Sequence, residues 1–284
     1  MDFKPHGMIM TTYIKVSVAG SKNTPETLCQ AFRHKFTPGG TGSWQGLTLT
    51  ADSEKADFFI DLGGGPQDPH KTRQNTIYVQ REPHAPLRHV KKKYQHVIFY
   101  QQYYHVAVWR IYYSFDELLA LKTPPKPKKI SSVTSGKSSG GRSKRLKFLL
   151  ELGSRTALDV WGNFAPPNAP FNKMGYTQFK QGGLLDYEFS VATEHMLVPG
   201  YFSEKFIDPL LCWCKVIYYG CPDIAGYFPQ GSYFWASPEN PLVYEEVVEE
   251  LQRPVDLEAI REARHLILNK YSLIPTLAGY IQTL

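Results

Sequence analysis

The segment from Tyr187 to Trp235 constrains the fold of this chain most strongly, because it places a helix pattern between two buried-strand patterns. The runs Phe189 to Ala192 and Lys215 to Tyr219 are rich in apolar, β-branched and aromatic residues, which is typical of strands buried on both faces of a parallel sheet. Between them, Phe206 to Leu211 carries apolar residues at helical spacing. The order strand, helix, strand predicts a βαβ unit and therefore half of a nucleotide-binding α/β domain.

Polar residues follow the first of these strands and begin the helix. Glu194 and His195 come directly after the strand, at the sheet edge where open α/β folds bind ligands. Ser203 is a natural N-cap, which puts Glu204 and Lys205 at the positive end of the helix dipole. Such an end binds phosphate oxygens, the lysine adds a charge for a diphosphate, and the glutamate can accept hydrogen bonds from ribose or sugar hydroxyls. The alternative is an ordinary βαβ unit with a solvated first helical turn.

The second strand ends in Gly220-Cys221-Pro222. Glycine at this position is expected to let a ligand approach the backbone closely.

The amino-acid sequence of this segment resembles the signature of glycosyltransferase family 10, the α1,3/1,4-fucosyltransferases. That signature reads approximately YKFxLxFEN, then GYxTEK, an apolar helix, a PVYYG-like strand with G-x-P, and P-x-S-F. The resemblance has no gap through Gly200 to Lys205 and covers about fifty residues. The matching positions are Tyr187, Phe189, Glu194, Gly200, Tyr201, Ser203, Glu204, Lys205, Tyr219, Gly220, Pro222, Phe228, Pro229, Ser232 and Phe234. His195 departs from the signature, since the family has a donor-site asparagine there.

The resemblance implies an α/β protein of GT-B type, with two Rossmann-like domains that face each other across a cleft. It implies an inverting glycosyltransferase of glycan biosynthesis that moves a sugar, fucose from GDP-fucose, to a hydroxyl of a glycan or glycoconjugate acceptor. Because of His195, another nucleotide-sugar such as UDP-xylose stays open as the donor. The residues implied for donor binding are Arg145, Glu194, His195, Tyr201, Ser203, Glu204 and Lys205.

Arg145 lies at the end of a Gly/Ser-rich basic stretch, TSGKSSGGRSKR, that leads into a predicted helix from Leu146 to Leu152. The stretch is not a P-loop, because Ser131 stands where that motif needs glycine. Backbone amides of such a loop, with an arginine at a helix start, can grip a diphosphate. In the family this segment carries an arginine, and Arg145 fits its spacing better than Arg142. The alternative interpretation of residues 134–144 is a flexible basic linker.

Glu82 follows a strong strand pattern from Asn75 to Gln80, so it lies at the carboxyl end of a predicted parallel strand. In the family this position corresponds to the E-S/P-P element that follows such a strand, and the glutamate of that element is the proposed general base. The resemblance therefore implies that Glu82 deprotonates the acceptor hydroxyl. The alternative is a surface carboxylate paired with Arg81 or Arg88.

The proline- and lysine-rich stretch KTPPKPKK, residues 122–129, is the clearest break in the chain, because proline at this density gives an extended connector. The length of 284 residues allows two domains. We therefore expect an acceptor-side α/β domain over 1–121, a donor-binding α/β domain over 130–255 and bracing helices over 256–284. The first domain is expected to contain strands over 12–19, 44–50 and 56–62 and a helix that begins after the N-cap Thr24.

Residues 88–113 combine a basic patch with a high density of aromatic side chains. Three interpretations remain, in decreasing order of weight: packing of a core, contact with an acceptor sugar, and stacking on single-stranded nucleic acid. Nucleic acid is not an expected partner.

The net charge of +6 favours a phosphate-bearing ligand and allows weak peripheral contact with an anionic membrane. No run approaches the apolar length needed to cross a bilayer, and the N-terminus lacks a signal-peptide pattern. Animal members of the family are anchored in the Golgi by an N-terminal helix, so we expect a soluble, cytoplasmic bacterial or viral form, the latter in the host cytoplasm. The chain has no Asp-x-Asp motif, and we expect activity without a cofactor or an obligatory metal.

Overall fold

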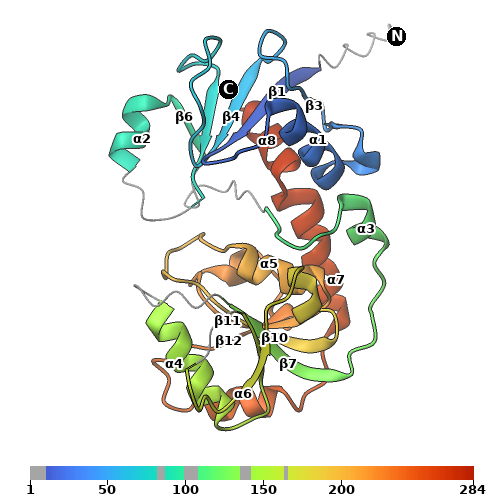
Figure 1. Ribbon diagram of the computed structural model, residues 1–284, viewed down its shortest axis with the longest axis vertical. Helices are drawn as coiled ribbons and strands as arrows, with labels where there is room; N and C mark the ends of the chain where they lie inside the picture. The colour runs from blue at the N-terminus through green and yellow to red at the C-terminus, as the bar shows by residue number, and fades with distance from the viewer. Residues whose placement is uncertain (1–10, 82–86, 99–107, 135–141, 163–165) are drawn as a thin grey trace, which may run out of the picture. The chain divides into compact units, whose positions relative to one another are not determined.

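The chain forms two compact α/β units, each built on a six-stranded sheet (Figure 1). The first unit comprises Met1–Val106, Ser114–Leu119 and Ser272–Leu284, and the second comprises Ala107–Tyr113 and Ala120–Tyr271. The computed structural model describes residues 11–81, 87–98, 108–134, 142–162 and 166–284.

The sheet of the first unit has the strand order β2-β3-β1-β4-β5-β6, and its strands are parallel except for β2. The strands are β1 (Thr12–Val18), β2 (Ser43–Trp44), β3 (Leu47–Leu49), β4 (Phe58–Leu62), β5 (Thr76–Val79) and β6 (His96–Ile98). The helices are α1 (Pro25–Phe36), α2 (Leu87–Lys93), most of α3 (Phe115–Ala120) and α8 (Leu273–Ile281). The parallel order confirms the predicted α/β class for this unit.

Helix α1 begins as the sequence predicts. The Thr24 side chain accepts a hydrogen bond from the backbone N–H of Thr27, and Pro25 occupies the first turn, where its missing N–H costs nothing. The helix buries Phe32 and Phe36 beneath the sheet.

The single strand predicted over 44–50 is wrong, because the chain folds there into the β2–β3 hairpin. Gln45 and Gly46 form its two-residue turn with φ values of 50° and 81°. Positive φ at two consecutive residues reverses the strand, and the glycine allows this at no steric cost.

A buried carboxylate holds the loop between β4 and β5 in place. Asp61 accepts hydrogen bonds from Ser17 Oγ at 2.6 Å, Lys71 Nζ at 2.7 Å and Tyr94 Oη at 3.1 Å. A Cβ atom on Gly65 would lie 2.4 Å from both Asp61 Oδ1 and Ser17 Oγ. Only glycine therefore lets this loop lie directly on the network.

The sheet of the second unit is fully parallel, in the order β12-β11-β10-β7-β8-β9. Its strands are β7 (Lys128–Val133), β8 (Asp159–Trp161), β9 (Asn172–Gly175), β10 (Tyr187–Thr193), β11 (Lys215–Tyr219) and β12 (Tyr233–Trp235). Its helices are α4 (Arg142–Gly153), α5 (Glu204–Leu211), α6 (Val243–Glu250) and α7 (Leu257–Leu266). The predicted βαβ unit is confirmed as β10, α5 and β11.

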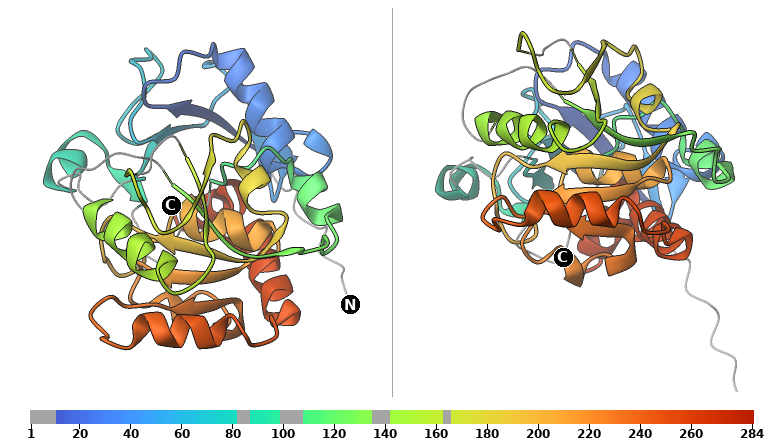
Figure 2. Two further views of the ribbon diagram at one scale, coloured as in Figure 1. Left: turned by 60° about the horizontal axis from the view of Figure 1, so that its bottom comes forward. Right: turned by 90° about the horizontal axis from the view of Figure 1, so that it is seen from below.

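Both faces of this sheet are covered, which explains the continuous apolar character of β10 and β11 (Figures 1 and 2). Phe189 and Ile217 belong to a buried cluster with residues of α4 and α6. On the opposite face Tyr218 packs against Phe206 of α5, with 4.5 Å between the ring centroids. Successive strand residues thus serve two different cores.

One expected boundary differs from the structure, since Lys128 and Lys129, placed in the proline-rich connector, are already the first residues of β7. In the C-terminal group 256–284, α7 belongs to the second unit and α8 to the first, with a π-helical turn (Ile267–Tyr271) before Ser272. In the described part of the chain, no helix has both the length and the apolar character to cross a membrane.

Candidate functional site

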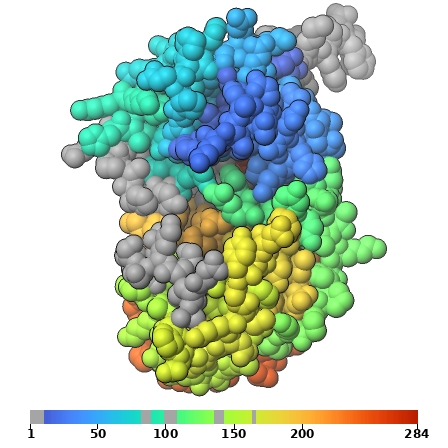
Figure 3. All heavy atoms as spheres, viewed as in Figure 1, coloured from blue at the N-terminus to red at the C-terminus, as the bar shows by residue number. Residues whose placement is uncertain are grey.

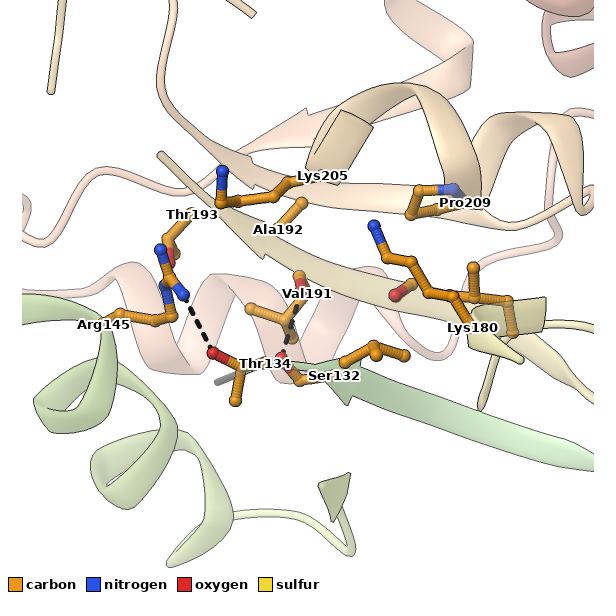
Figure 4. A pocket seen from close by; sticks show the side chains of 12 residues that line it. Ser132, Thr134, Arg145, Lys180, Val191, Ala192, Thr193, Lys205 and Pro209 are labelled. Atoms are coloured by element: carbon orange, nitrogen blue, oxygen red, sulfur yellow. Dashed lines mark hydrogen bonds between the residues drawn. The ribbon is translucent and has the colours of Figure 1, made fainter. Parts of the chain in front are cut away.

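Two adjoining pockets lie at the carboxyl ends of β7 and β10 in the second unit. The smaller one is shown in Figure 4, and its polar lining includes Ser132, Thr134, Arg145, Lys180, Thr193 and Lys205. The larger one has a volume of about 270 Å³ and is lined by Lys144, Arg145, Phe148, Thr193, Glu194, His195, Met196, Leu197, Tyr219 and Pro238. Arg145 and Thr193 line both pockets, so the two pockets are neighbours on either side of these side chains.

Arg145 projects from the first turns of α4 and spans the ends of two neighbouring strands. Its Nε donates to Thr193 Oγ1 at 3.0 Å and its Nη1 donates to Thr134 Oγ1 at 2.9 Å. Thr193 is the last residue of β10, and Thr134 directly follows β7. The parallel pairing of these strands therefore fixes the guanidinium at the mouth of the pocket. A guanidinium held in this way is oriented to donate two hydrogen bonds to an anion such as a phosphate group.

Glu194, Ser203 and Lys205 form one hydrogen-bonded group. The carboxylate of Glu194 accepts from the backbone N–H and the Oγ of Ser203 at 2.8 and 2.7 Å. Lys205 Nζ lies 3.1 Å from Glu194 Oε2 and 3.0 Å from Ser203 Oγ. The side chain of Glu194 is fully buried, whereas that of Lys205 is 23% exposed. Glu194 therefore positions the lysine, and the lysine faces the pocket.

This arrangement changes the expected use of the helix N-terminus. Ser203 is the N-cap of α5, as predicted, and its Oγ accepts from the backbone N–H of Lys205. However, the Glu194 carboxylate already lies against this cap and neutralises part of the positive partial charge of the helix dipole at the N-terminus of α5. Side-chain cations, rather than helix amides, are the main positive groups facing the pocket.

Lys180 is a pocket residue that the sequence interpretation missed. Its Nζ donates to Asp208 Oδ2 at 2.7 Å and to the backbone carbonyl of Glu204 at 3.1 Å. Asp208 is fully buried within α5 and also accepts from the backbone N–H of Arg110, and burial raises the pKa of its carboxyl. An aspartate inside the apolar run FIDPLL was the available signal, because a buried carboxylate needs a partner.

Glu204 lies beside two of these cations and keeps 31% of its side-chain surface exposed. Partial burial acts to raise the pKa of Glu204, but the charges of Lys205 and Lys180 outweigh it and lower the pKa to about 2. Burial acts to lower the pKa of Lys205, and the charges of Glu194 and Glu204 outweigh it and raise that pKa. Glu204 and Lys205 therefore stay ionised at neutral pH, and Glu204 can accept hydrogen bonds from a ligand.

His195 lines the larger pocket, and Tyr201 packs against it. The rings meet edge to face with 5.6 Å between centroids, and Tyr201 Oη lies 3.5 Å from His195 Nδ1. Tyr201 is only 3% exposed and lines neither pocket, so it contacts the imidazole from the protein interior.

The expectation that Gly220 admits a ligand is wrong. A Cβ atom there would lie 2.3 Å from Tyr218 Oη and 2.7 Å from Glu194 Cγ. The space beside the glycine is filled by these two side chains of the protein, and the glycine allows their close packing.

Glu82 lies outside the described residues, as does the part 135–141 of the Gly/Ser-rich stretch. Within the described ranges, no three His, Cys, Asp or Glu side chains lie together so that they could hold a metal ion. Cys212 and Cys214 are buried and form no disulfide, and burial raises the pKa of Cys214 to about 11.

Two units, each built on a mainly parallel six-stranded sheet, give an α/β fold of GT-B type. No protein-family model and no curated protein matches the sequence.

Among solved structures, an α1,3-fucosyltransferase crystallised with GDP is similar, with a TM-score of 0.53 and 16% identity over 93% of this chain and 84% of that chain. A glycosyltransferase from Rickettsia africae ESF-5 is also similar, with a TM-score of 0.53 and 12% identity over 96% of this chain and 97% of that chain. At these identities the likeness establishes the fold.

Proposed function

We propose that this protein is an inverting glycosyltransferase that transfers fucose from GDP-fucose to a hydroxyl of a glycan. The observation that carries the proposal is the convergence of Arg145, Lys180 and Lys205 on one small pocket (Figure 4). Lys180 and Lys205 are each paired with a carboxylate, so these three cations act as oriented N–H donors for diphosphate oxygens rather than as an uncompensated positive charge. The signature-like sequence from Gly200 to Lys205 and the similar fucosyltransferase structures, one of them with GDP-fucose, support this donor.

The two adjoining pockets match the two ends of such a donor. The diphosphate lies between Arg145, Lys180 and Lys205, where each cation is already oriented by a hydrogen-bonded partner. The larger pocket has an apolar wall of Phe148, Leu197 and Pro238, which suits the flat face of a nucleobase. Glu204, ionised and partly exposed, accepts a hydrogen bond from a hydroxyl of the ribose or the sugar.

The reaction proceeds by a single displacement at the anomeric carbon. Glu82 removes the proton of the acceptor hydroxyl, whose oxygen forms the new bond while the bond to the diphosphate breaks. Arg145 and Lys205 stabilise the departing nucleoside diphosphate as its negative charge develops. These cations take the role that a divalent ion has in other transferases, so activity does not require a metal. The protein works in the cytoplasm and has no resident cofactor.

The test is calorimetric titration of the purified chain with GDP, UDP, GDP-fucose and UDP-xylose in the presence of a chelator. We expect tight binding of the GDP compounds, weakened at least about tenfold in Lys205→Ala and in Arg145→Ala, because each substitution removes one charge-assisted contact. Lys147→Ala is the matched control, since Lys147 is an exposed lysine of α4 that lines neither pocket.

Each other outcome has a definite meaning. Preferential binding of UDP compounds would support a glycosyltransferase but change the proposed donor from GDP-fucose to a UDP-sugar. Binding that appears only with added manganese overturns the metal-independent arrangement. Absence of binding by any nucleotide rejects the transferase, and salt-sensitive binding of oligonucleotides instead favours a nucleic-acid-binding protein. Binding of GDP-fucose without transfer to any glycan favours a non-catalytic sugar-binding protein.

A further inference from the structure

An exposed pair of stacked aromatic rings lies on the second unit. The rings of Tyr112 and Phe179 are 4.8 Å apart at their centroids and inclined by 30°. Tyr112 is 72% exposed and Phe179 is 41% exposed. Only two other aromatic side chains in the described ranges are exposed, Tyr13 and Tyr176, and Tyr176 lies three residues before Phe179. We call Tyr112 and Phe179 the aromatic platform.

The backbone on both sides of the platform is held by side-chain hydrogen bonds. Gln181 Oε1 accepts from the backbone N–H of Tyr112 at 2.9 Å. Thr177 Oγ1 donates to the backbone carbonyl of Phe179 at 2.7 Å, and the N–H of Gly182 donates to the same carbonyl at 3.0 Å. The backbone that carries both rings is therefore held before any ligand arrives, which lowers the entropy lost on binding.

The platform continues directly into the cationic site. Phe179 is followed by Lys180, which lines the smaller pocket. Two residues before Tyr112, the backbone N–H of Arg110 donates to Asp208, the same carboxylate that holds Lys180. The Arg110 charge also contributes to lowering the pKa of Glu204, so this segment lies close to the start of α5. The segment 172–183 is on the surface of the second unit in Figure 3, in yellow.

We propose that the aromatic platform binds a neutral pyranose ring of the acceptor glycan, with the outer face of Tyr112 as the stacking surface and Phe179 as its support. This proposal rests on the proposed function, because an acceptor must lie beside the donor pocket. A pyranose presents a face of C–H groups, and the electron-rich face of an aromatic ring attracts such groups. The flanking side chains of Thr177, Gln178 and Gln181 are polar, which suits sugar hydroxyls better than the apolar centre of a protein interface.

The experiment uses the full chain with saturating GDP on an array of neutral oligosaccharides, followed by measurement of Kd for the best-bound oligosaccharide. Tyr112→Ala is expected to raise that Kd about tenfold, a stacking effect of the size seen when an aromatic platform is removed. Tyr112→Phe keeps the ring and is expected to bind normally. Phe179→Ala is expected to weaken binding less, because it removes only the support.

The control is Leu242→Ala, which removes an exposed apolar side chain elsewhere on the second unit and is expected to change nothing. The Kd of GDP is measured for every variant and should stay constant. Unchanged oligosaccharide affinity in Tyr112→Ala, or no binding by any oligosaccharide of the array, overturns the platform. In either case the GDP titration still decides the proposed function separately, because no platform residue lines the nucleotide pockets.

Discussion

Lys205 and Glu194 form an ion pair of 3.1 Å in which the carboxylate is completely buried and the ammonium group keeps access to the pocket. The pair is asymmetric in its surroundings, because Ser203 donates two hydrogen bonds to the carboxylate. Glu194, held by Ser203, in turn holds the Lys205 Nζ in one position. The positive charge that the proposed donor meets is fixed in advance, as electrostatic catalysis requires.

This pairing predicts coupled stability effects. Lys205→Met leaves a buried carboxylate without its cation, so we expect a loss of about 2 kcal/mol in unfolding free energy. Glu194→Gln should also destabilise the protein, but the double variant should lose less than the sum by about 1 kcal/mol. Urea denaturation of the four proteins measures this coupling. Additive losses would show that the two side chains do not stabilise each other.

The lowered pKa of Glu204 predicts a pH dependence of stability. Its folded-state pKa of about 2 lies below the ordinary value of 4.5, so the ionised carboxylate stabilises the second unit above pH 4.5. This contribution is lost as the pH falls from 4.5 toward 2. Glu204→Gln should therefore be less stable than the parent near neutral pH, and the difference should shrink across that window. A difference independent of pH would contradict the electrostatic origin.

Glu82 as general base predicts a separation of turnover from binding. Glu82→Gln should lower kcat by about 100-fold or more, because the amide cannot accept the acceptor proton. The Kd of GDP should not change, since the nucleotide pockets lie entirely in the second unit. Glu54→Gln removes an exposed carboxylate of the first unit and serves as the control. Full turnover in Glu82→Gln would exclude this base.

The packing at Gly65 predicts a defect confined to the first unit. Gly65→Ala places a methyl group 2.4 Å from Asp61 Oδ1 and Ser17 Oγ, so the loop must move away from the buried network. We expect a loss of about 2 kcal/mol in the unfolding free energy of this unit, with an unchanged Kd for GDP. Gly226→Ala is the control, because nothing lies within 4 Å of an added Cβ there. Equal stability of both variants would mean that the loop adapts freely.

Several parts of the fold could be predicted because their causes are local. The apolar runs of β10 and β11 follow from burial on both faces, and the starts of α1 and α5 follow from capping by Thr24 and Ser203. The strand predicted over 44–50 failed because two residues, Gln45 and Gly46, adopt positive φ within an otherwise strand-like run. A hairpin turn with glutamine in its first position gives little sequence signal.

The candidate site was predicted in part. Lys205 was singled out because it follows its own N-cap, and Arg145 because a family-like spacing places it at a helix start, and both line the smaller pocket. Lys180 was missed, because its partner Asp208 is 28 residues away in the chain. The role of Gly220 was misjudged, because the space beside it is filled by side chains from β11 and from the end of β10.

The sequence by itself determined the α/β class, the βαβ unit and the residue types at the strand ends, because periodicity and capping act within one or two turns of the chain. Only the tertiary structure decided which of these residues meet. Parallel pairing of β7 with β10 brings Thr134 and Thr193 under one guanidinium, and packing of 109–113 against α5 brings Tyr112 beside Phe179. Such contacts depend on strand order and side-chain packing between distant segments, which no local pattern encodes.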